Sequence, residues 1–463
     1  MKIVVAEKIA APAVALLRAH AGWAVVLPED IGDGLMRHLQ DADALIVRSA
    51  VEVNDALLAG AEKLRVIGRA GVGVDNVDLD AATRKGIAVM NTPGANAVAV
   101  TEHTLGMMIA LARHLPRADR LMRAGKWEKK SLQGAELSGK TLGIIGLGRI
   151  GTEVARRAQA FKMTVVAFDP YVSPMVCEDL GVRLASLNEV LAEADYLTLH
   201  LGLSPETAGI INTGSIVRMK RGVRLVNCAR GELVDEAALA DALKSGHVAG
   251  AALDVFQHEP PHGSPLTALE NVISTPHIAG STYEAQEAVG VQIAQQVIEY
   301  LTKGIFQNAV NVPSVSYEQY IEMQPFLVLA ERLGSFVAEI TPGQPQEIAL
   351  RYRGRIASWK TELIRNAAVM GALNRVLAER TNLVNAASIA ESRGLRITEG
   401  RKTGATSGGA SEVLTIRFRT SANEQIVRGT VLHGNSPRLL SVGDIDIEAR
   451  LERNLIYLRN RDV

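Results

Sequence analysis

The sequence is poor in cysteine. Its 463 residues include two, Cys177 and Cys228, which lie 51 positions apart with no C-x-x-C pair and no histidine at ligand spacing. Disulfide-stabilised secreted domains carry cysteine far more densely, and structural zinc sites need clustered thiolates or imidazoles. The sequence therefore supports neither a disulfide framework nor a metal site, and it favours a reducing cytoplasm as the compartment.

Net charge and long apolar runs are also missing. Lys plus Arg and Asp plus Glu number 50 each, so the formal net charge is zero. No run of like charge indicates nucleic acid or an anionic membrane as a partner. No apolar run approaches the roughly 20 residues that a membrane-spanning helix needs, so we expect a soluble protein.

The chain has ample material for globular cores. Hydrophobic residues make up 47% and charged residues 22%, which is close to the usage of ordinary globular proteins. Because the length is about three times the ~150-residue prior for one domain, we expect two or three domains.

Two stretches carry the pattern of parallel α/β layers, in which short apolar runs alternate with amphipathic helical segments. In residues 1–97 the predicted strands cover 2–6, 23–27, 44–48, 65–68 and 87–90. Residues 98–283 begin with an apolar helix over 98–115, and their six predicted strands cover 141–145, 164–168, 196–199, 224–227, 250–254 and 272–275. The fold class predicted here is α/β, with two doubly wound parallel-sheet domains, one flavodoxin-like and one of the Rossmann type.

The pattern changes after a long helix predicted over 283–301. Amphipathic helices are predicted over 323–340, 361–379 and 385–393, and alternating strands over 348–353, 412–417 and 425–432. This region, 314–453, is predicted to be a third domain of the α+β class. Residues 403–410 are rich in Gly, Ser and Thr, and we interpret them as a surface loop because no Lys-Ser/Thr pair follows to make a phosphate cradle.

A glycine-rich motif follows the first strand of the Rossmann stretch. The segment TLGIIGLGRIG places Gly146, Gly148 and Gly151 between a buried strand and a helix predicted over 152–161, with Arg149 and Ile150 inside the loop. These glycines allow a tight turn, a close approach of the pyrophosphate and close helix packing. Asp169 ends the next strand, where a carboxylate accepts from ribose hydroxyls and repels a 2′-phosphate. The motif therefore predicts a site for NAD rather than NADP.

Three polar residues follow strands of the same sheet. Arg230 in VNCARGELVDE can grip a carboxylate with two hydrogen bonds, and His277 in STPHIAG has an unperturbed pKa of about 6.5, suited to moving a proton. Glu259 in QHEPPHG can fix the histidine tautomer. Taken singly, each has an ordinary structural interpretation, but beside a dinucleotide fold the set predicts hydride transfer from an alcohol.

Other candidates carry less weight. His258 and His262 have the spacing of a helical metal pair, but two prolines between them prevent that helix. The earlier Gly71 and Gly73 have Asn76 where a third glycine would stand, so that segment is interpreted as a cleft loop. Cys228 has two open interpretations, as a residue lining the nicotinamide pocket or as a small buried residue.

These motifs together resemble the D-isomer-specific 2-hydroxyacid dehydrogenases, most closely their phosphoglycerate dehydrogenase branch. Segments RAGVGVDNVDL, GKWEKK, LGIIGLGRIG, VNCARGELVDE, AALDVF and TPHIAGST carry the resemblance, which extends over roughly residues 1–313. It implies that Arg230, Glu259 and His277 are catalytic and that Asp254 contacts the nicotinamide carboxamide. It also implies a discontinuous substrate-binding domain of residues 1–97 and 284–313 and an NAD-binding domain of residues 98–283.

The same resemblance implies a substrate, an assembly and a third-domain type. The substrate would be 3-phosphoglycerate, with Arg48, Arg69, Gly71 and Lys129 at substrate-binding positions, and Lys129 would reach across a dimer. Dimer and tetramer remain open. Residues 314–453 resemble an intervening allosteric substrate-binding domain, and 454–463 resemble the first strand of a serine-binding ACT domain, expected to fray or to dock on a neighbour. We therefore expect no serine feedback inhibition.

Two alternative functions remain: one is an enzyme with a different substrate, and the other is a protein of a different functional class. The first is a dehydrogenase for an unphosphorylated D-2-hydroxy acid, which the cationic residues at positions 48, 69 and 129 argue against. The second is a non-catalytic, NAD-sensing scaffold, which the third domain and the lack of basic tails argue against.

Overall fold

The computed structural model describes residues 1–463 except 33, 314, 378–380, 403–411, 453–454 and 459–463. The chain divides into two compact units. One consists of Met1–Thr92 together with Gly290–Val463, and the other of Pro93–Val289. Within the described ranges, no helix combines the length and the apolar character that crossing a membrane requires.

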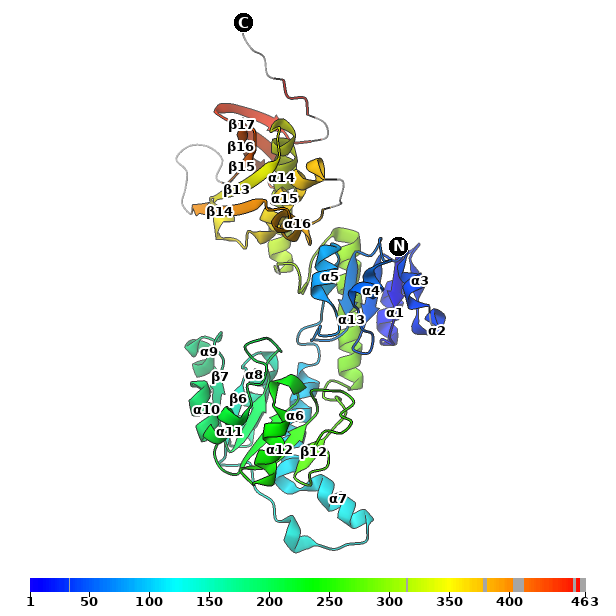
Figure 1. Ribbon diagram of the computed structural model, residues 1–463, viewed down its shortest axis with the longest axis vertical. Helices are drawn as coiled ribbons and strands as arrows, with labels where there is room; N and C mark the ends of the chain where they lie inside the picture. Colours follow the sequence, from blue (N-terminus) through cyan, green and yellow to red (C-terminus); the bar gives the residue numbers. More distant parts are fainter. Residues whose placement is uncertain (33, 314, 378–380, 403–411, 453–454, 459–463) are drawn as a thin grey trace. The chain divides into compact units, whose positions relative to one another are not determined.

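The N-terminal part of the first unit is a five-stranded parallel sheet (Figure 1). Its strand order is β2-β1-β3-β4-β5, the flavodoxin-like arrangement. The strands are β1 (Lys2–Val5), β2 (Ala24–Val26), β3 (Ala44–Val47), β4 (Val66–Arg69) and β5 (Ala88–Met90). The helices between them are α1 (Ala11–Arg18), α2 (Pro28–Ile31), α3 (Leu35–Leu39), α4 (Asp55–Leu58) and α5 (Leu79–Arg84). Strands β3 and β5 are buried at every residue, as expected for a sheet covered on both faces.

A helix from much later in the sequence completes this layer. Helix α13 (Tyr283–Lys303) packs so closely on β4 that a Cβ atom at Gly68 would lie 2.8 Å from Cγ1 of Ile293. After the helix, the Asn311 side chain accepts from the backbone N–H of Val89 at 2.8 Å and donates to the carbonyl of Ile87 at 2.9 Å. The chain therefore returns to the edge of the N-terminal sheet.

The second unit is built on a seven-stranded parallel sheet of order β12-β11-β10-β9-β6-β7-β8, the Rossmann arrangement. Its strands are β6 (Thr141–Ile145), β7 (Thr164–Phe168), β8 (Arg183–Leu184), β9 (Tyr196–Leu199), β10 (Val223–Asn227), β11 (Val248–Leu253) and β12 (Val272–Ser274). Its helices are α6 (Ala97–Arg113), α7 (Leu115–Arg123), α8 (Arg149–Ala160), α9 (Pro174–Asp179), α10 (Leu187–Glu193), α11 (Thr213–Arg218) and α12 (Glu236–Lys244). Strand order reverses between β6 and β9, so a crevice opens at their carboxyl ends, where such sheets bind ligands.

Three details of this unit differ from the sequence predictions. The helix predicted over 98–115 ends at Arg113, because His114 adopts a left-handed φ of 55° and Pro116 has no N–H to continue the hydrogen-bond ladder of α6. A separate helix, α7, then begins at Leu115. The two-residue edge strand β8 was not predicted, and α8 begins at Arg149, three residues earlier than the predicted helix.

The third region is a mixed sheet of order β14-β13-β15-β16-β17-β18, antiparallel except between β13 and β14. Its strands are β13 (Pro345–Arg353), β14 (Arg396–Lys402), β15 (Val413–Thr420), β16 (Glu424–Leu432), β17 (Ser436–Val442) and β18 (Ile445–Arg450). Its helices are α14 (Tyr317–Ile340), α15 (Glu362–Val376) and α16 (Ala386–Ser392). Every second residue of β15 is buried, so one face of the sheet packs on a core and the other faces solvent. The predicted fold class, two parallel α/β layers and an α+β domain, is confirmed.

Two sequence predictions lie wholly or partly outside the described residues. The loop predicted over 403–410 is among the residues left out, and so is most of the segment 454–463. Residues 455–458 are described and belong to no strand, and the Tyr457 ring lies edge-on to Phe336 of α14 with centroids 5.9 Å apart.

Helices α14 and α15 approach each other through a glycine on each helix. A Cβ atom at Gly334 of α14 would lie 2.0 Å from the carbonyl oxygen of Ala368, and one at Gly371 of α15 would lie 2.0 Å from that of Glu331. These neighbours are backbone atoms, so they cannot move aside without shifting a helix. Only glycine at both positions allows this helix pair to form.

We expect Gly371→Ala to lower the stability of the third domain by about 1–3 kcal/mol or more, because the added methyl group overpacks the helix contact. Gly106→Ala is the matched control, since Gly106 is also helical but has no atom within 4 Å of its Cβ position. That control should gain about 0.5–1 kcal/mol from helix propensity. Thermal unfolding of both variants checks the prediction, and equal midpoints would contradict it.

Candidate active site

The glycine loop after β6 forms a cradle at the strand-order reversal. A Cβ atom at Gly146, where φ is 94°, would lie 2.5 Å from the carbonyl oxygen of His200, and one at Gly151 would lie 2.1 Å from that of Gly146. Gly148, which caps the N-terminus of α8, has no atom within 4 Å of its Cβ position. Packing therefore requires the first and third glycines, whereas the second leaves open space for a ligand.

The surroundings of this cradle fit a dinucleotide. The first N–H groups of α8 and the positive end of its dipole suit the pyrophosphate, and Ile150 stands with Arg149 in its first turn. Asp169 accepts from the backbone N–H groups of Leu147 and Tyr171, each at 2.8 Å. Its carboxylate thus lies beside the loop with lone pairs remaining for ribose hydroxyls. The Arg149 guanidinium donates to the carbonyl of Pro93.

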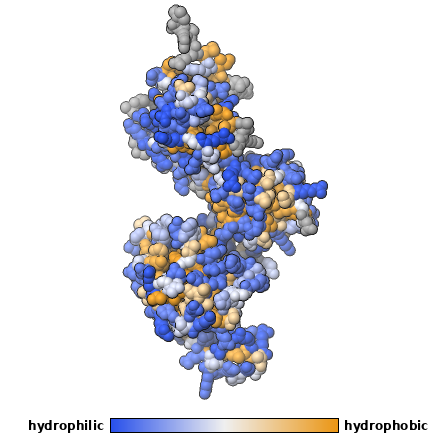
Figure 2. Space-filling model, viewed as in Figure 1, coloured by the Kyte–Doolittle hydropathy of each residue, from blue (hydrophilic) through white to orange (hydrophobic). Residues whose placement is uncertain are grey.

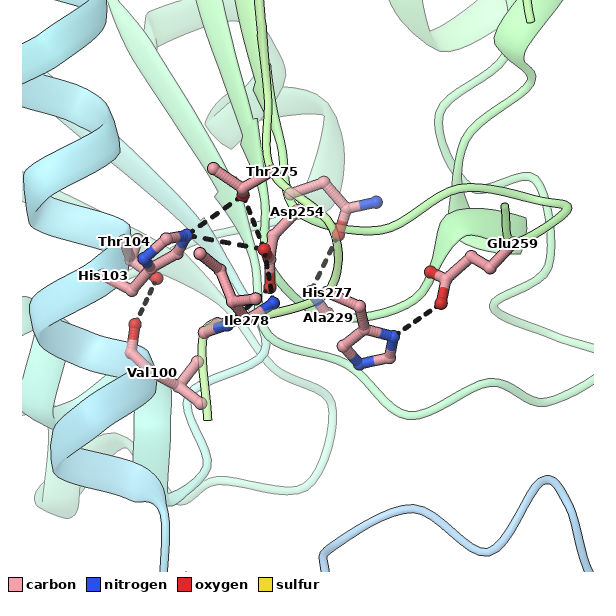
Figure 3. Close-up of polar contacts among 11 residues, drawn as sticks. Val100, His103, Thr104, Ala229, Asp254, Glu259, Thr275, His277 and Ile278 are labelled. Carbon is pink, nitrogen blue, oxygen red and sulfur yellow. Dashed lines mark hydrogen bonds and ion pairs between the residues drawn. The ribbon is translucent and has the colours of Figure 1, made fainter. Parts of the chain in front are cut away.

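His277 and Glu259 form a hydrogen-bonded pair, as Figure 3 shows. Nδ1 of His277 lies 2.7 Å from Oε2 of Glu259, whose other oxygen accepts from the backbone N–H of Phe256 at 3.1 Å. The carboxylate accepts, so Nδ1 carries the proton and Nε2 is left to exchange one with a ligand. Both side chains retain exposed surface, 48% for His277 and 37% for Glu259. The pair can therefore reach solvent or substrate.

The contact between His277 and Glu259 shifts the pKa of both side chains. The hydrogen bond that His277 donates to Glu259 is the largest influence on the pKa of His277. Together with the charges of Glu259 and Asp254, it raises this pKa against the opposing effects of burial and Arg230. Burial alone would raise the pKa of Glu259, but the bond to His277 and the His277 charge outweigh it, so that pKa is lowered. Glu259 is therefore ionised at neutral pH, and His277 is a stronger base than a free histidine.

Arg230 follows β10, the strand beside β11. Its guanidinium donates to the carbonyl of Ala229 at 2.7 Å, and its own carbonyl accepts from the Asn227 side chain at 2.8 Å. These bonds fix the strand end from which the side chain extends. Arg230 is close enough to His277 for its charge to lower the histidine pKa, so the structure brings the two groups to one neighbourhood.

The turn that carries His277 packs around the Asp254 carboxylate. The Asp254 side chain has no exposed surface, and it accepts from the backbone N–H groups of Ile278 and Ala279, both at 2.8 Å. Its carbonyl accepts from the N–H of His277 at 2.8 Å. Burial by itself would raise the pKa of Asp254, but these bonds and those from His103 and Thr275 outweigh it and lower the pKa. Its predicted contact with the nicotinamide stays a prediction.

Cys228 is buried at the end of β10. Burial is the main cause that raises the pKa of its thiol to about 12, against a hydrogen bond with Thr104. The thiol is therefore protonated and unreactive at neutral pH. Its predicted contact with the cofactor stays a prediction.

Two histidines near the site were missed in the sequence. His103 on α6 contacts Thr275 and Asp254, and His200 follows β9, where burial lowers its pKa to about 4. His103 lies inside an apolar helix 151 positions before Asp254, so no spacing rule indicates it. The place of His200, directly after a strand at the sheet's carboxyl edge, was a signal that could have found it.

The predicted substrate residues fall in different units. Arg48, Arg69 and Gly71 belong to the first unit, where a Cβ atom at Gly71 would lie 1.5 Å from a terminal nitrogen of Arg69, so only glycine allows this guanidinium position. The backbone N–H of Arg48 donates to Glu7 at 2.7 Å. Lys129 belongs to the second unit and lines an open hollow of about 470 Å³ together with Trp127, Glu128, Lys130 and Ser131. Among the described residues, no group of His, Cys, Asp or Glu side chains could hold a metal ion.

Comparison with known proteins agrees with this architecture. Residues 105–279 match the family model of the D-isomer specific 2-hydroxyacid dehydrogenase NAD binding domain, and residues 322–443 match that of the D-3-phosphoglycerate dehydrogenase intervening domain. A D-3-phosphoglycerate dehydrogenase of Methanocaldococcus jannaschii is 42% identical over 92% of this chain and 81% of its own. One of Bacillus subtilis is 39% identical over 92% of this chain and 80% of its own.

Solved structures match about two thirds of the chain. A D-lactate dehydrogenase of Aquifex aeolicus, complexed with NAD and lactic acid, is 31% identical with a TM-score of 0.60 over 68% of this chain and 100% of its own. A glyoxylate reductase from Paecilomyes thermophila is also 31% identical, with a TM-score of 0.60 over 67% of this chain and 98% of its own. The second unit is an NAD-binding domain. The chain belongs to the D-isomer specific 2-hydroxyacid dehydrogenases and, within them, to the D-3-phosphoglycerate dehydrogenase family.

Proposed function

We propose that this chain catalyses the NAD-dependent oxidation of D-3-phosphoglycerate to 3-phosphohydroxypyruvate, the first step of L-serine biosynthesis, in the cytoplasm. The observation that carries the proposal is the His277–Glu259 pair, bonded at 2.7 Å on the sheet that also bears the dinucleotide cradle. The names of the relatives support the choice of substrate, since they are D-3-phosphoglycerate dehydrogenases.

His277 is the general base of the proposed reaction. With Nδ1 committed to Glu259, Nε2 takes the proton of the substrate hydroxyl. The C2–H bond breaks with both electrons leaving as hydride, and the C2–O bond becomes a carbonyl. When bound, NAD⁺ supplies the hydride acceptor. Glu259 stabilises the imidazolium that forms and keeps the ring oriented.

Arg230 orients the substrate in this proposal. A guanidinium presents two parallel N–H groups, which match a carboxylate and also polarise a neighbouring oxygen. Arg48, Arg69 and Lys129 supply positive charge for the substrate phosphate, and Gly71 leaves room for Arg69. Lys129 binds a phosphate as a point charge rather than as a bidentate fork.

Self-association is part of the proposal. On α7 and the segment after it, Leu115 is 50%, Met122 55% and Trp127 80% exposed. Figure 2 shows apolar areas among hydrophilic residues at the lower end of the second unit, where this segment lies in Figure 1. Large exposed apolar side chains are typical of surfaces that a partner covers. A second copy would cover them in a dimer or tetramer and bring Lys129 to the partner's substrate.

The substrate is tested by following NADH absorbance with D-3-phosphoglycerate, D-glycerate and D-lactate side by side at alkaline pH. We expect kcat/KM for the phosphorylated acid to exceed the others by at least about 10²-fold, because charge-assisted hydrogen bonds to the phosphate are lost with the other two. Equal turnover of D-lactate would favour the alternative that the Aquifex neighbour represents. No turnover of any acid would favour a scaffold.

The pH profile tests the role of Glu259. His277 must be neutral to accept a proton, so oxidation falls as the pH drops through its pKa, which Glu259 raises. Glu259→Gln removes that effect, so the acidic limb of kcat/KM should move to lower pH while kcat falls about 10-fold or more. Glu206→Gln, on an exposed loop of the same unit, is the control. A limb that stays in place, or moves to higher pH, would contradict the assignment.

A charge deletion tests Lys129. Lys129→Met should raise KM for 3-phosphoglycerate about 10-fold or more, with KM for NAD⁺ unchanged, because one charge-assisted hydrogen bond to the phosphate is lost. Lys130→Met is the matched control, since its side chain is also exposed and lines the same hollow. A change confined to kcat, or equal effects of the two substitutions, would argue against a role in phosphate binding.

A further inference from the structure

His103 contacts the buried side of the segment that carries His277. It projects from α6, and its Nε2 atom lies 3.2 Å from Oγ1 of Thr275 and 3.5 Å from Oδ1 of Asp254 (Figure 3). Its side chain is only 21% exposed. Thr275 is two residues before His277, so His103 contacts both the segment that leads into the turn and the carboxylate that the turn surrounds.

The direction of each hydrogen bond follows from its neighbours. The Thr275 hydroxyl lies 2.5 Å from Oδ1 of Asp254 and gives its proton to that carboxylate. The same hydroxyl can therefore only accept from His103, and Asp254 is an acceptor as well. Nε2 of His103 must carry a hydrogen, and it is the donor to both.

The turn that carries His277 depends on these hydrogen bonds. His277 adopts a left-handed φ of 51°, which costs a residue with a side chain about 1–2 kcal/mol. The turn is held because Asp254 accepts from the N–H groups of Ile278 and Ala279. Whatever fixes the Asp254 carboxylate in this place therefore also holds the direction in which His277 points.

We propose that His103 is a positioning residue of this site, whose Nε2–H donates to Thr275 and Asp254 and so holds the turn that carries His277. This inference rests on the proposed function, because it concerns the base of that reaction. His103 itself is not expected to touch the substrate or the nucleotide.

The charges around His277 set the expected sign. Three charged groups influence its pKa: Glu259 and Asp254 raise it, and Arg230 lowers it. For Asp254, the hydrogen bond from His103 comes first among the influences that lower its pKa against burial, and the Cys228 thiol nearby is protonated. Without the His103 donor, Asp254 stays ionised but the turn is held less firmly, so the bond from His277 to Glu259 is weakened. That bond is the largest influence raising the pKa of His277, so the titration midpoint of His277 falls.

The test compares His103→Leu, which removes the donor, with His103→Gln, whose amide restores an N–H at similar reach. Glu102→Gln, exposed on the same helix, is the control. In protein labelled with ¹³C at histidine Cε1, the His277 signal is identified with His277→Gln and titrated by NMR. We expect the His277 midpoint to fall by about half a pH unit in His103→Leu and to return in His103→Gln, with kcat about 10-fold lower in the first variant only.

Three outcomes decide the matter. An unchanged midpoint and kcat in His103→Leu that still binds NADH by fluorescence would overturn the proposal, and so would equal losses in the Leu and Gln variants. If His103→Leu does not fold, Thr275→Val removes the same connection and must shift the midpoint in the same direction, or the proposal fails. The titration needs no substrate and can therefore be interpreted by itself. If the wild-type protein does not oxidise 3-phosphoglycerate, the proposed function is wrong, but the titration still tests the role of His103.

Discussion

A fully buried carboxylate organises the edge of the Rossmann sheet where we propose that catalysis occurs. Taking a charge out of water costs several kcal/mol unless hydrogen bonds compensate, and Asp254 receives them from two backbone amides, one hydroxyl and one imidazole. Each donor belongs to a segment that must then stay in place. The segment after β12 is held by the amides of Ile278 and Ala279, and α6 is tied to it through His103. The partly exposed His277–Glu259 pair therefore stands on a turn that buried hydrogen bonds hold in place.

Sheet topology explains why residues far apart in sequence share this edge. Strands β10, β11 and β12 are neighbours in the order given, and all run parallel. Their carboxyl ends therefore meet on one side, and each supplies one chemical group: Arg230 after β10, Asp254 after β11 and His277 after β12. Helix α12 connects β10 to β11, whereas the connection from β11 to β12 has no helix and carries Glu259.

This dependence on strand ends also decides what the sequence could predict. Buried strands have a distinctive pattern of short apolar runs, so β6, β7 and β9 were predicted to the residue, and polar residues directly after strands identified Arg230 and His277. Glu259 was suggested by chemistry and is joined to His277 in the structure. His103 could not be predicted, because it lies in a helix and its partners are defined only by tertiary packing. The break at His114 was missed although the sequence signals it: Arg113 and His114 end the apolar run, and Pro116 follows at a position typical of a helix end.

The chemistry at this edge does not by itself select a phosphorylated substrate. In the proposed reaction, Arg230, Glu259 and His277 act on features that every 2-hydroxy acid shares: a carboxylate, a hydroxyl and a hydrogen on the same carbon. The solved neighbours named for lactate and glyoxylate have this fold at nearly the same TM-score, as expected if one scaffold serves several substrates. Selectivity must then come from charge placed outside the catalytic set, where a phosphate would lie. Cationic side chains can provide this selectivity. They form charge-assisted hydrogen bonds with the phosphate, and an unphosphorylated acid does not make those bonds.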